Sequence, residues 1–160
     1  MKIVQLSAIL LSLLVFSSCC STCNKCANPI QYGKGTFGYD LAILSAKDSV
    51  IVLKNGDAQV LVSPKYQGKV FTSTAQGLSG NSAGWINYKA LDADKIATHI
   101  NAYGGEDRMW LGPEGGQFSI FFKPGDKMVF DNWQTPAGLD SEPWSLGAHD
   151  SVSVSMGKEM

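Results

Sequence analysis

Residues 50–62 read VIVLKNGDAQVLV, in which two runs of β-forming residues flank an Asn-Gly pair. Valine and isoleucine favour strands because their branched side chains pack well on a pleated surface. Both residues of an Asn-Gly pair tolerate the positive φ angles of a type I′ turn. The stretch therefore predicts an antiparallel hairpin with a type I′ turn across Asn55-Gly56.

Other segments on either side of this hairpin also have strand-like patterns. We predict strands at residues 68–74, 85–88, 117–122, 128–130 and 151–155. Asp40 is predicted to cap a short helix that ends near Lys47, and residues 92–101 could form a helical turn. Short strands separated by Gly/Pro turns indicate an all-β, antiparallel β-sandwich or barrel with one short N-terminal helix. Its predicted core includes Trp85, Phe118, Ile120 and Phe122.

The composition excludes two broad classes of protein. The 160 residues are 44% hydrophobic and 10% aromatic, whereas disordered chains lack such apolar bulk. With 13 basic and 14 acidic residues, the chain has no positive excess with which to neutralise phosphates. We therefore expect one globular domain that does not bind nucleic acid.

The N-terminus has the pattern of an export signal. Lys2 precedes an uncharged and mostly apolar run over residues 3–16. The length of this run falls within the roughly 7–15 residues of a signal-peptide core and is short of the ~20 residues that span a bilayer. The following Phe16-Ser17-Ser18-Cys19 resembles a bacterial lipobox, in which the enzyme cuts before the cysteine and its thiol carries diacylglycerol. We predict a signal peptide at 1–18, lipidation of Cys19 and an envelope protein anchored to the membrane, on the periplasmic side rather than the surface.

All four cysteines lie between positions 19 and 26. Cys20, Cys23 and Cys26 form a CxxCxxC pattern, but a closed zinc site or iron–sulfur cluster usually takes four ligands. We therefore predict a flexible cysteine-containing tether over 19–36, with no metal and no cofactor. The globular part is predicted to occupy residues 37–160.

Five segments carry a resemblance to known families. Residues 50–53, 58–63 and 66–70 resemble the opening of the galactose-mutarotase-like supersandwich. The block YGGEDRMWLGPEGGQFS at 103–119, together with DNWQTP at 131–136, resembles an uncharacterised family of Bacteroidetes-type lipoproteins. The resemblance covers residues 36–160 and implies a supersandwich fold.

That resemblance also implies a longer protein. Mutarotases use a glutamate near the C-terminus as general base, and no residue here maps onto it, since Glu159 lies in a different context. The strand pattern over 152–156 has no later partner, and an open edge exposes unpaired backbone groups. We therefore expect residues 37–160 to be the N-terminal portion of a sandwich.

Residues 103–119 contain the best candidate site. If residues 106–110 are extended, Glu106, Arg108 and Trp110 share one face. Charged groups bind sugar hydroxyls through charge-assisted hydrogen bonds, and an indole stacks on the apolar face of a pyranose. The predicted ligand-binding residues are Glu106, Arg108, Trp110, Glu114 and Trp133, with Trp144 as a further aromatic group.

Two other interpretations of these residues stay open. Arg108 could form an internal ion pair with Glu106, Asp107 or Asp131, with Trp110 in the core. Glu106 and Glu114 could be paired carboxylates of a glycosidase. The two histidines, His99 and His149, fit packed or solvated roles better than catalysis, so no catalytic residue is assigned.

Three hypotheses on function follow from these observations. The favoured one is a cell-envelope lipoprotein that binds carbohydrate. The second is a carbohydrate-active enzyme, an epimerase or glycan hydrolase, whose catalytic base lies beyond residue 160. The third is a structural envelope protein without a ligand. A fold alone does not choose among them, because one fold can host many functions.

Overall fold

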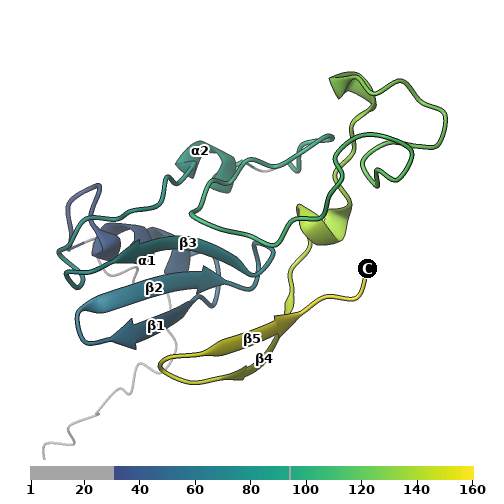
Figure 1. The fold of residues 1–160 in the computed structure, drawn as a ribbon. Helices are drawn as coiled ribbons and strands as arrows, with labels where there is room; N and C mark the ends of the chain where they lie inside the picture. The colour runs from purple at the N-terminus through teal and green to yellow at the C-terminus, as the bar shows by residue number, and fades with distance from the viewer. Residues whose placement is uncertain (1–30, 94) are drawn as a thin grey trace, which may run out of the picture.

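The computed structural model describes residues 31–93 and 95–160. The predicted signal peptide, the lipidation site Cys19 and the cysteines at 20, 23 and 26 lie outside these described residues. Figure 1 shows the main sheet of β1, β2 and β3 with a helix on one side, a C-terminal hairpin below it and a long irregular excursion in green.

The N-terminal helix α1 spans Phe37–Ser45. Phe37, Leu41 and Leu44 recur at the spacing of one helix face, which packs into the core. The predicted cap was wrong by four residues: Thr36 is the N-cap, and its side-chain oxygen accepts a hydrogen bond from the Tyr39 amide at 3.3 Å. Asp40 lies in the first turn and is buried, where it accepts hydrogen bonds from Ser82 Oγ and, at 2.5 Å, from Tyr88 OH.

This cap makes the first testable prediction. Thr36→Ala removes the acceptor for the Tyr39 amide, and loss of such a cap typically costs about 1 kcal/mol. Chemical denaturation should show that loss in the free energy of unfolding, and Thr36→Ser should restore most of it. Equal stability of the alanine variant and the wild type would contradict the assignment of Thr36 as the cap.

The main sheet has the order β1-β2-β3 and is antiparallel throughout. Its strands are β1 Ile51–Asn55, β2 Ala58–Ser63 and β3 Lys69–Thr74. The predicted hairpin is confirmed, but its turn is different. Asn55 pairs with Ala58, so the turn residues are Gly56-Asp57, and only Gly56 has a positive φ, at 61°. A type I′ turn needs two positive φ angles, whereas this pattern fits type II′.

A β-bulge interrupts β3 beside the later site. Leu61 pairs with Thr72 and Val62 pairs with Val70, so Phe71 is the extra residue. On the other edge of β3, Val70 binds residues 106 and 107 through backbone hydrogen bonds of 2.9–3.3 Å. Residues 106 and 107 therefore pair with the edge of β3 at Val70, which would otherwise be left open there.

The core lies between α1 and one face of the sheet. It contains mainly apolar and aromatic side chains from α1, β2, β3 and the segments that follow them. Buried members of this cluster are Phe37, Leu44, Leu61, Tyr66, Phe71, Ile86 and Leu91. Tyr66 makes edge contacts with Phe71 at 5.5 Å and with Tyr103 at 4.8 Å between ring centroids, which brings the loop around residue 103 onto the core.

Two predictions between β3 and residue 101 were wrong. Residues 85–88 do not form a strand: Ile86 makes a single bridge to Gly104, and the short helix α2 follows at Tyr88–Leu91. The helical turn therefore precedes the predicted range of 92–101. Asn87 caps α2, since its side-chain oxygen accepts a hydrogen bond from the Ala90 amide, and this cap ends any extended conformation.

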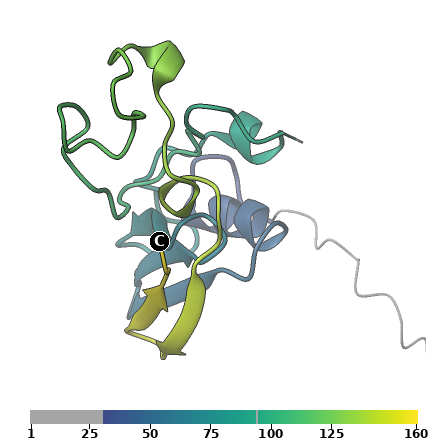
Figure 2. The ribbon, with the colours of Figure 1, turned by 90° about the vertical axis from the view of Figure 1, so that its right-hand side faces the viewer.

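The excursion from about residue 109 to 135 contains no strand. The predicted strands at 117–122 and 128–130 are both absent, and the short 3₁₀ helix η1 lies at Phe130–Asn132. Phe118 is 75% exposed and Ile120 is also exposed, so their predicted core positions were wrong, whereas Phe121 is buried at 1% exposure. Phe122 is half-buried. Both Figure 1 and Figure 2 show the excursion standing away from the sheet.

The chain then passes through a second 3₁₀ helix, η2 at Ala137–Leu139, into a two-stranded sheet. Its strands are β4 Ser145–His149, which was not predicted, and β5 Val154–Gly157. The predicted strand at 151–155 thus begins later, and it pairs with the preceding β4 instead of lying unpaired. The fold class is confirmed: the chain is all-β, with antiparallel sheets and a short N-terminal helix.

Candidate functional site

A loop that packs across the edge of β3 builds the candidate site. Its backbone runs between two neighbours: the Gly105 amide donates to Trp85 O at 2.7 Å, and the Glu106 amide donates to Val70 O at 2.9 Å. Gly104 and Gly105 have φ angles of 84° and 112°. A Cβ at Gly104 would lie 2.2 Å from Trp85 O, and one at Gly105 would lie 2.9 Å from Val70 O. Only glycine allows the loop to approach both segments this closely.

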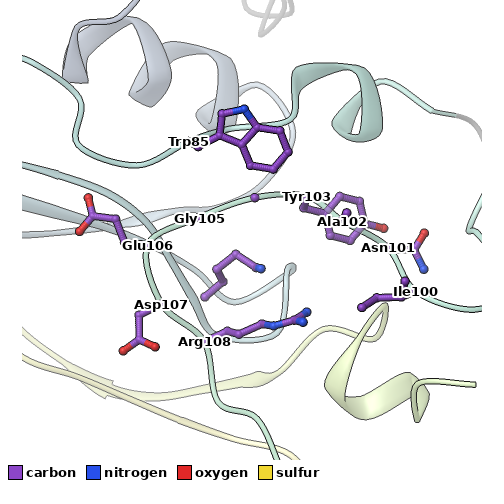
Figure 3. Close-up of a pocket in the computed structure, with 11 residues that line it drawn as sticks. Trp85, Ile100, Asn101, Ala102, Tyr103, Gly105, Glu106, Asp107 and Arg108 are labelled. Atoms are coloured by element: carbon purple, nitrogen blue, oxygen red, sulfur yellow. The ribbon is translucent and has the colours of Figure 1, made fainter. Parts of the chain in front are cut away.

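This loop borders a cavity of about 370 Å³. Lys69 from β3, Trp85 and residues 100–108 line it, and Figure 3 shows this arrangement. Ligand pockets in proteins commonly measure about 300–1,000 Å³. The cavity therefore has the size for a small ligand.

Lys69 is the most unusual residue in this cavity. The residue is only 4% exposed although its side chain carries a charge. Burial, with the nearby positive charge of Arg108, lowers the pKa of Lys69 to about 8, and Asp140 acts in the opposite direction. The sequence offered one signal for this residue, since Lys69 stands at an inward position of the alternating β3 pattern, two residues before the buried Phe71.

Arg108 connects the cavity to the aromatic part of the excursion. Its guanidinium carbon lies 3.9 Å from the centre of the Trp110 ring, in a cation–π contact. Burial lowers the pKa of Arg108, and the carboxylates of Asp140 and Glu114 partly oppose that effect. In Figure 3 the guanidinium extends toward Asn101 and Ile100.

A buried polar pair fixes the far wall of the cavity. The Asn101 amide donates to Asp140 Oδ1 at 2.8 Å, and Asn101 Nδ2 donates to Asp140 Oδ2 at 2.5 Å. Both residues are buried. Sequence reasoning missed this pair, because 39 positions separate its members.

Trp85 lies at the rim of the cavity rather than in the core, where it was predicted. It is 66% exposed. Figure 3 shows its indole beside the Tyr103–Gly105 backbone, and a Cβ at Gly104 would come within 3.0 Å of its ring. The exposed ring follows from the pairing of residues 85–87 with residues 103–105, which leaves the side chain to lie across the glycines.

The five predicted ligand-binding residues fall into two groups. Glu106 and Arg108 both line the cavity. Glu106 accepts hydrogen bonds from the Ser73 amide and hydroxyl, and in Figure 3 its carboxylate points away from the guanidinium of Arg108. Trp110, Glu114 and Trp133 lie outside the cavity lining.

Those three residues belong to an aromatic stack in the excursion. Trp110 Nε1 donates to Glu114 Oε1 at 2.8 Å, and the Trp110 ring stacks on Phe121 at 5.1 Å. Phe121 stacks in turn on Trp133 at 4.5 Å. Trp144 lies elsewhere, with its Nε1 donating to Gly138 O. Two of the three rings that the sequence suggested as a sugar platform, Trp110 and Trp133, thus each stack on Phe121, and Trp110 also contacts Arg108.

The alternative roles have little geometric support within residues 31–93 and 95–160. No salt bridge there involves Arg108. Glu106 and Glu114 bind separate partners, Ser73 and Trp110. His99 Nδ1 contacts Trp133 O at 2.6 Å, and His149 is exposed on β4.

The described part of the chain shows neither a candidate membrane span nor a candidate metal site. None of its helices has the length and apolarity needed to cross a membrane. It also holds no group of three or more His, Cys, Asp or Glu side chains placed to bind a metal ion.

Comparison with known proteins gives a family but no activity. The model of a family of unknown function (DUF6786) matches residues 35–160. No curated protein and no solved structure matches the chain. Since the family match includes α1, all five strands and the whole cavity, the chain belongs to this family of unknown function, DUF6786.

Proposed function

We propose that this protein is a cell-envelope lipoprotein that binds carbohydrate in the cavity beside β3. The observation that carries the proposal is an exposed indole, Trp85, at the rim of a cavity into which two cationic side chains converge. Envelope location and lipidation of Cys19 rest on the apolar run at 3–16 and the small residues before the cysteine.

The chemistry of a sugar suits this arrangement. A pyranose presents an apolar face of C–H groups, which an aromatic ring can cover, and a rim of hydroxyls, which need hydrogen-bond partners. Trp85 supplies the ring in this proposal. Arg108 and Lys69 supply charged donors, whose hydrogen bonds are stronger than those of neutral groups.

Trp85 replaces the ring predicted from sequence. The Trp110 ring contacts Arg108 and Phe121 and is half-buried, so it has less free surface for a ligand. In the proposed site Trp110 holds Arg108 in position, and Glu114 in turn holds the indole. Trp110 is thus a positioning residue, and Trp85 is the residue that touches the sugar.

This assignment predicts that substitution of Trp85 changes glycan affinity, whereas substitution of Trp110 changes the thermal midpoint. Trp85→Ala should weaken glycan affinity tenfold or more and leave the thermal midpoint nearly unchanged, because the ring is mostly exposed. Trp110→Ala should lower the midpoint, because its removal leaves a gap between Arg108 and Phe121. Calorimetric titration with a glycan panel measures the affinity, and circular dichroism measures the midpoint.

Phe118→Ala serves as the matched control, since Phe118 is likewise a mostly exposed aromatic residue and lies outside the cavity. It should change neither quantity. The proposal fails if the wild-type chain binds no glycan of the panel, or if Trp85→Ala retains wild-type affinity for every glycan that binds.

A further inference from the structure

Two cations converge in the cavity without a counter-ion. Within the described residues, Lys69 Nζ has no hydrogen bond to any acceptor and no salt bridge. Nζ instead lies over the Phe71 ring, 6.0 Å from its centre. Arg108 lines the same cavity and likewise forms no salt bridge there.

The carboxylates around the cavity do not neutralise these cations directly. Glu106 is held by Ser73, and in Figure 3 the carboxylates of Glu106 and Asp107 both point away from the Arg108 guanidinium. The carboxylate of Asp140 raises the pKa of both cations, but both of its oxygens already accept hydrogen bonds from Asn101. Glu114 also acts on Arg108, but its Oε1 accepts the hydrogen bond of Trp110 Nε1. The two positive charges are thus faced only by carboxylates that other residues already bind.

Such an arrangement is costly for a protein that has no ligand for it. Lysine is rarely buried without a partner, because the ammonium loses its hydration. The cost is seen here in the pKa of Lys69, which burial and Arg108 lower to about 8. An anionic group between Lys69 and Arg108 would remove both causes, since it would replace the lost hydration and screen the two positive charges.

We propose that the ligand of this cavity is an acidic sugar, whose anionic substituent lies between Lys69 Nζ and the Arg108 guanidinium while its ring covers Trp85. This inference rests on the carbohydrate-binding function proposed above. The planar guanidinium can bind two oxygens of one anionic group, and the ammonium adds a third donor. A uronate carboxylate and a sulfate ester share this chemistry.

Paired methyl glycosides separate the contribution of the ligand's negative charge to affinity from the contribution of its sugar ring. The probes are the methyl glycosides of glucuronic, galacturonic and mannuronic acids, each beside its neutral hexoside, with methyl glucoside 6-sulfate as the sulfate arm. Calorimetric titration of the full chain at pH 7 and low salt should give at least a tenfold tighter dissociation constant for one acidic member than for its neutral partner.

The variants place that preference in the cavity. Lys69→Met and Arg108→Gln should each reduce it about tenfold or more, whereas Lys54→Met should leave it unchanged, because Lys54 lies exposed on β1 outside the cavity. Methionine conserves the length and apolar stem of Lys69, so this variant retains the fold even if Arg108→Gln loses its contact with Trp110.

Each outcome separates the two proposals. Preference for a uronate or for the sulfate supports the inference and identifies the source of the negative charge. Equal affinity for neutral and acidic partners overturns the inference and leaves carbohydrate binding intact. A lack of binding by every probe and by the glycan panel overturns both.

Discussion

Lys69→Met is expected to stabilise the protein by about 2 kcal/mol at pH 7, while it weakens any acidic ligand. The pKa of Lys69 is about 8 in the folded chain, against 10.5 for an ordinary lysine. Each pH unit between these two values corresponds to about 1.4 kcal/mol. We expect less than the full difference, because the amine faces a cavity that water can enter.

The pH dependence has a definite sign. Between pH 8 and pH 10.5 the unfolded chain holds the Lys69 proton and the folded chain has lost it, so the stability of the wild type rises with pH in this window. The methionine variant lacks this contribution. Its advantage over the wild type should therefore be greatest below pH 8 and should shrink as the pH approaches 10.

Urea denaturation of both chains at pH 7, 8 and 9.5 tests this expectation. Using the difference between the two chains removes the contributions of Tyr66, Tyr88 and Tyr103, whose pKa values are all raised by burial and which both chains share. Lys54→Met is the control for loss of a lysine. A Lys69→Met chain that is less stable than the wild type at pH 7 would show that the ammonium has a structural partner.

A gain in stability together with a loss of binding in Lys69→Met would show that Lys69 serves a ligand and does not hold the fold together. A lysine that helped to hold β3 in place would weaken the fold when removed. A lysine retained for a ligand destabilises the free protein, because its cost is offset only when the ligand is bound. The same variant therefore tests the cavity by two independent measurements.

The parts of the fold that could be predicted from sequence are those determined locally. The hairpin at residues 50–62 and the strand at 69–74 are confirmed, since each depends on neighbouring residues and a short turn. The type of turn was wrong because the register places Gly56-Asp57 at its tip, and register depends on the pairing of both whole strands.

The failures occur where a strand needs a distant partner. Residues 117–122 have strong β propensity, but no neighbouring strand pairs with them, and the Phe121 ring instead stacks between Trp110 and Trp133. Propensity reports how well a side chain suits a pleated surface and cannot supply that surface. The exposed Phe118 is the direct consequence.

The candidate site was predictable only where its residues lie close together in the sequence. Glu106 and Arg108 were recognised because they lie two residues apart on an extended segment. Lys69 and Trp85 were not, since only the backbone pairing of residues 106 and 107 with β3, and of 103–105 with 85–87, brings them to the cavity. Contacts across tens of residues leave no periodic pattern in a single sequence.

The glycine at the centre of this pairing carries the second large prediction. Gly104→Ala should destabilise the chain by about 3 kcal/mol and abolish glycan binding. A positive φ of 84° costs an alanine about 1–2 kcal/mol, and the new Cβ, 2.2 Å from Trp85 O, forces two backbone segments apart at a cost of about 1–3 kcal/mol more.

Gly116→Ala separates these two causes. Gly116 has a similar φ of 91°, but a Cβ there would meet nothing within 4 Å. The Gly116→Ala control should be destabilised only by the strain of its positive φ, about 1–2 kcal/mol, and should keep wild-type glycan affinity. Urea denaturation and calorimetric titration of both variants provide the comparison.

Comparison of glycan affinity between Gly104→Ala and Gly116→Ala tests whether the ligand contacts Trp85. If binding depends on Trp85 lying against Gly104, then displacing the indole must remove affinity even in the fraction of Gly104→Ala chains that remains folded. Titration at 10 °C, with the folded fraction determined by circular dichroism, isolates that fraction. Affinity equal to that of Gly116→Ala would mean that the ligand does not contact Trp85, and the cavity beside β3 would no longer be the candidate site.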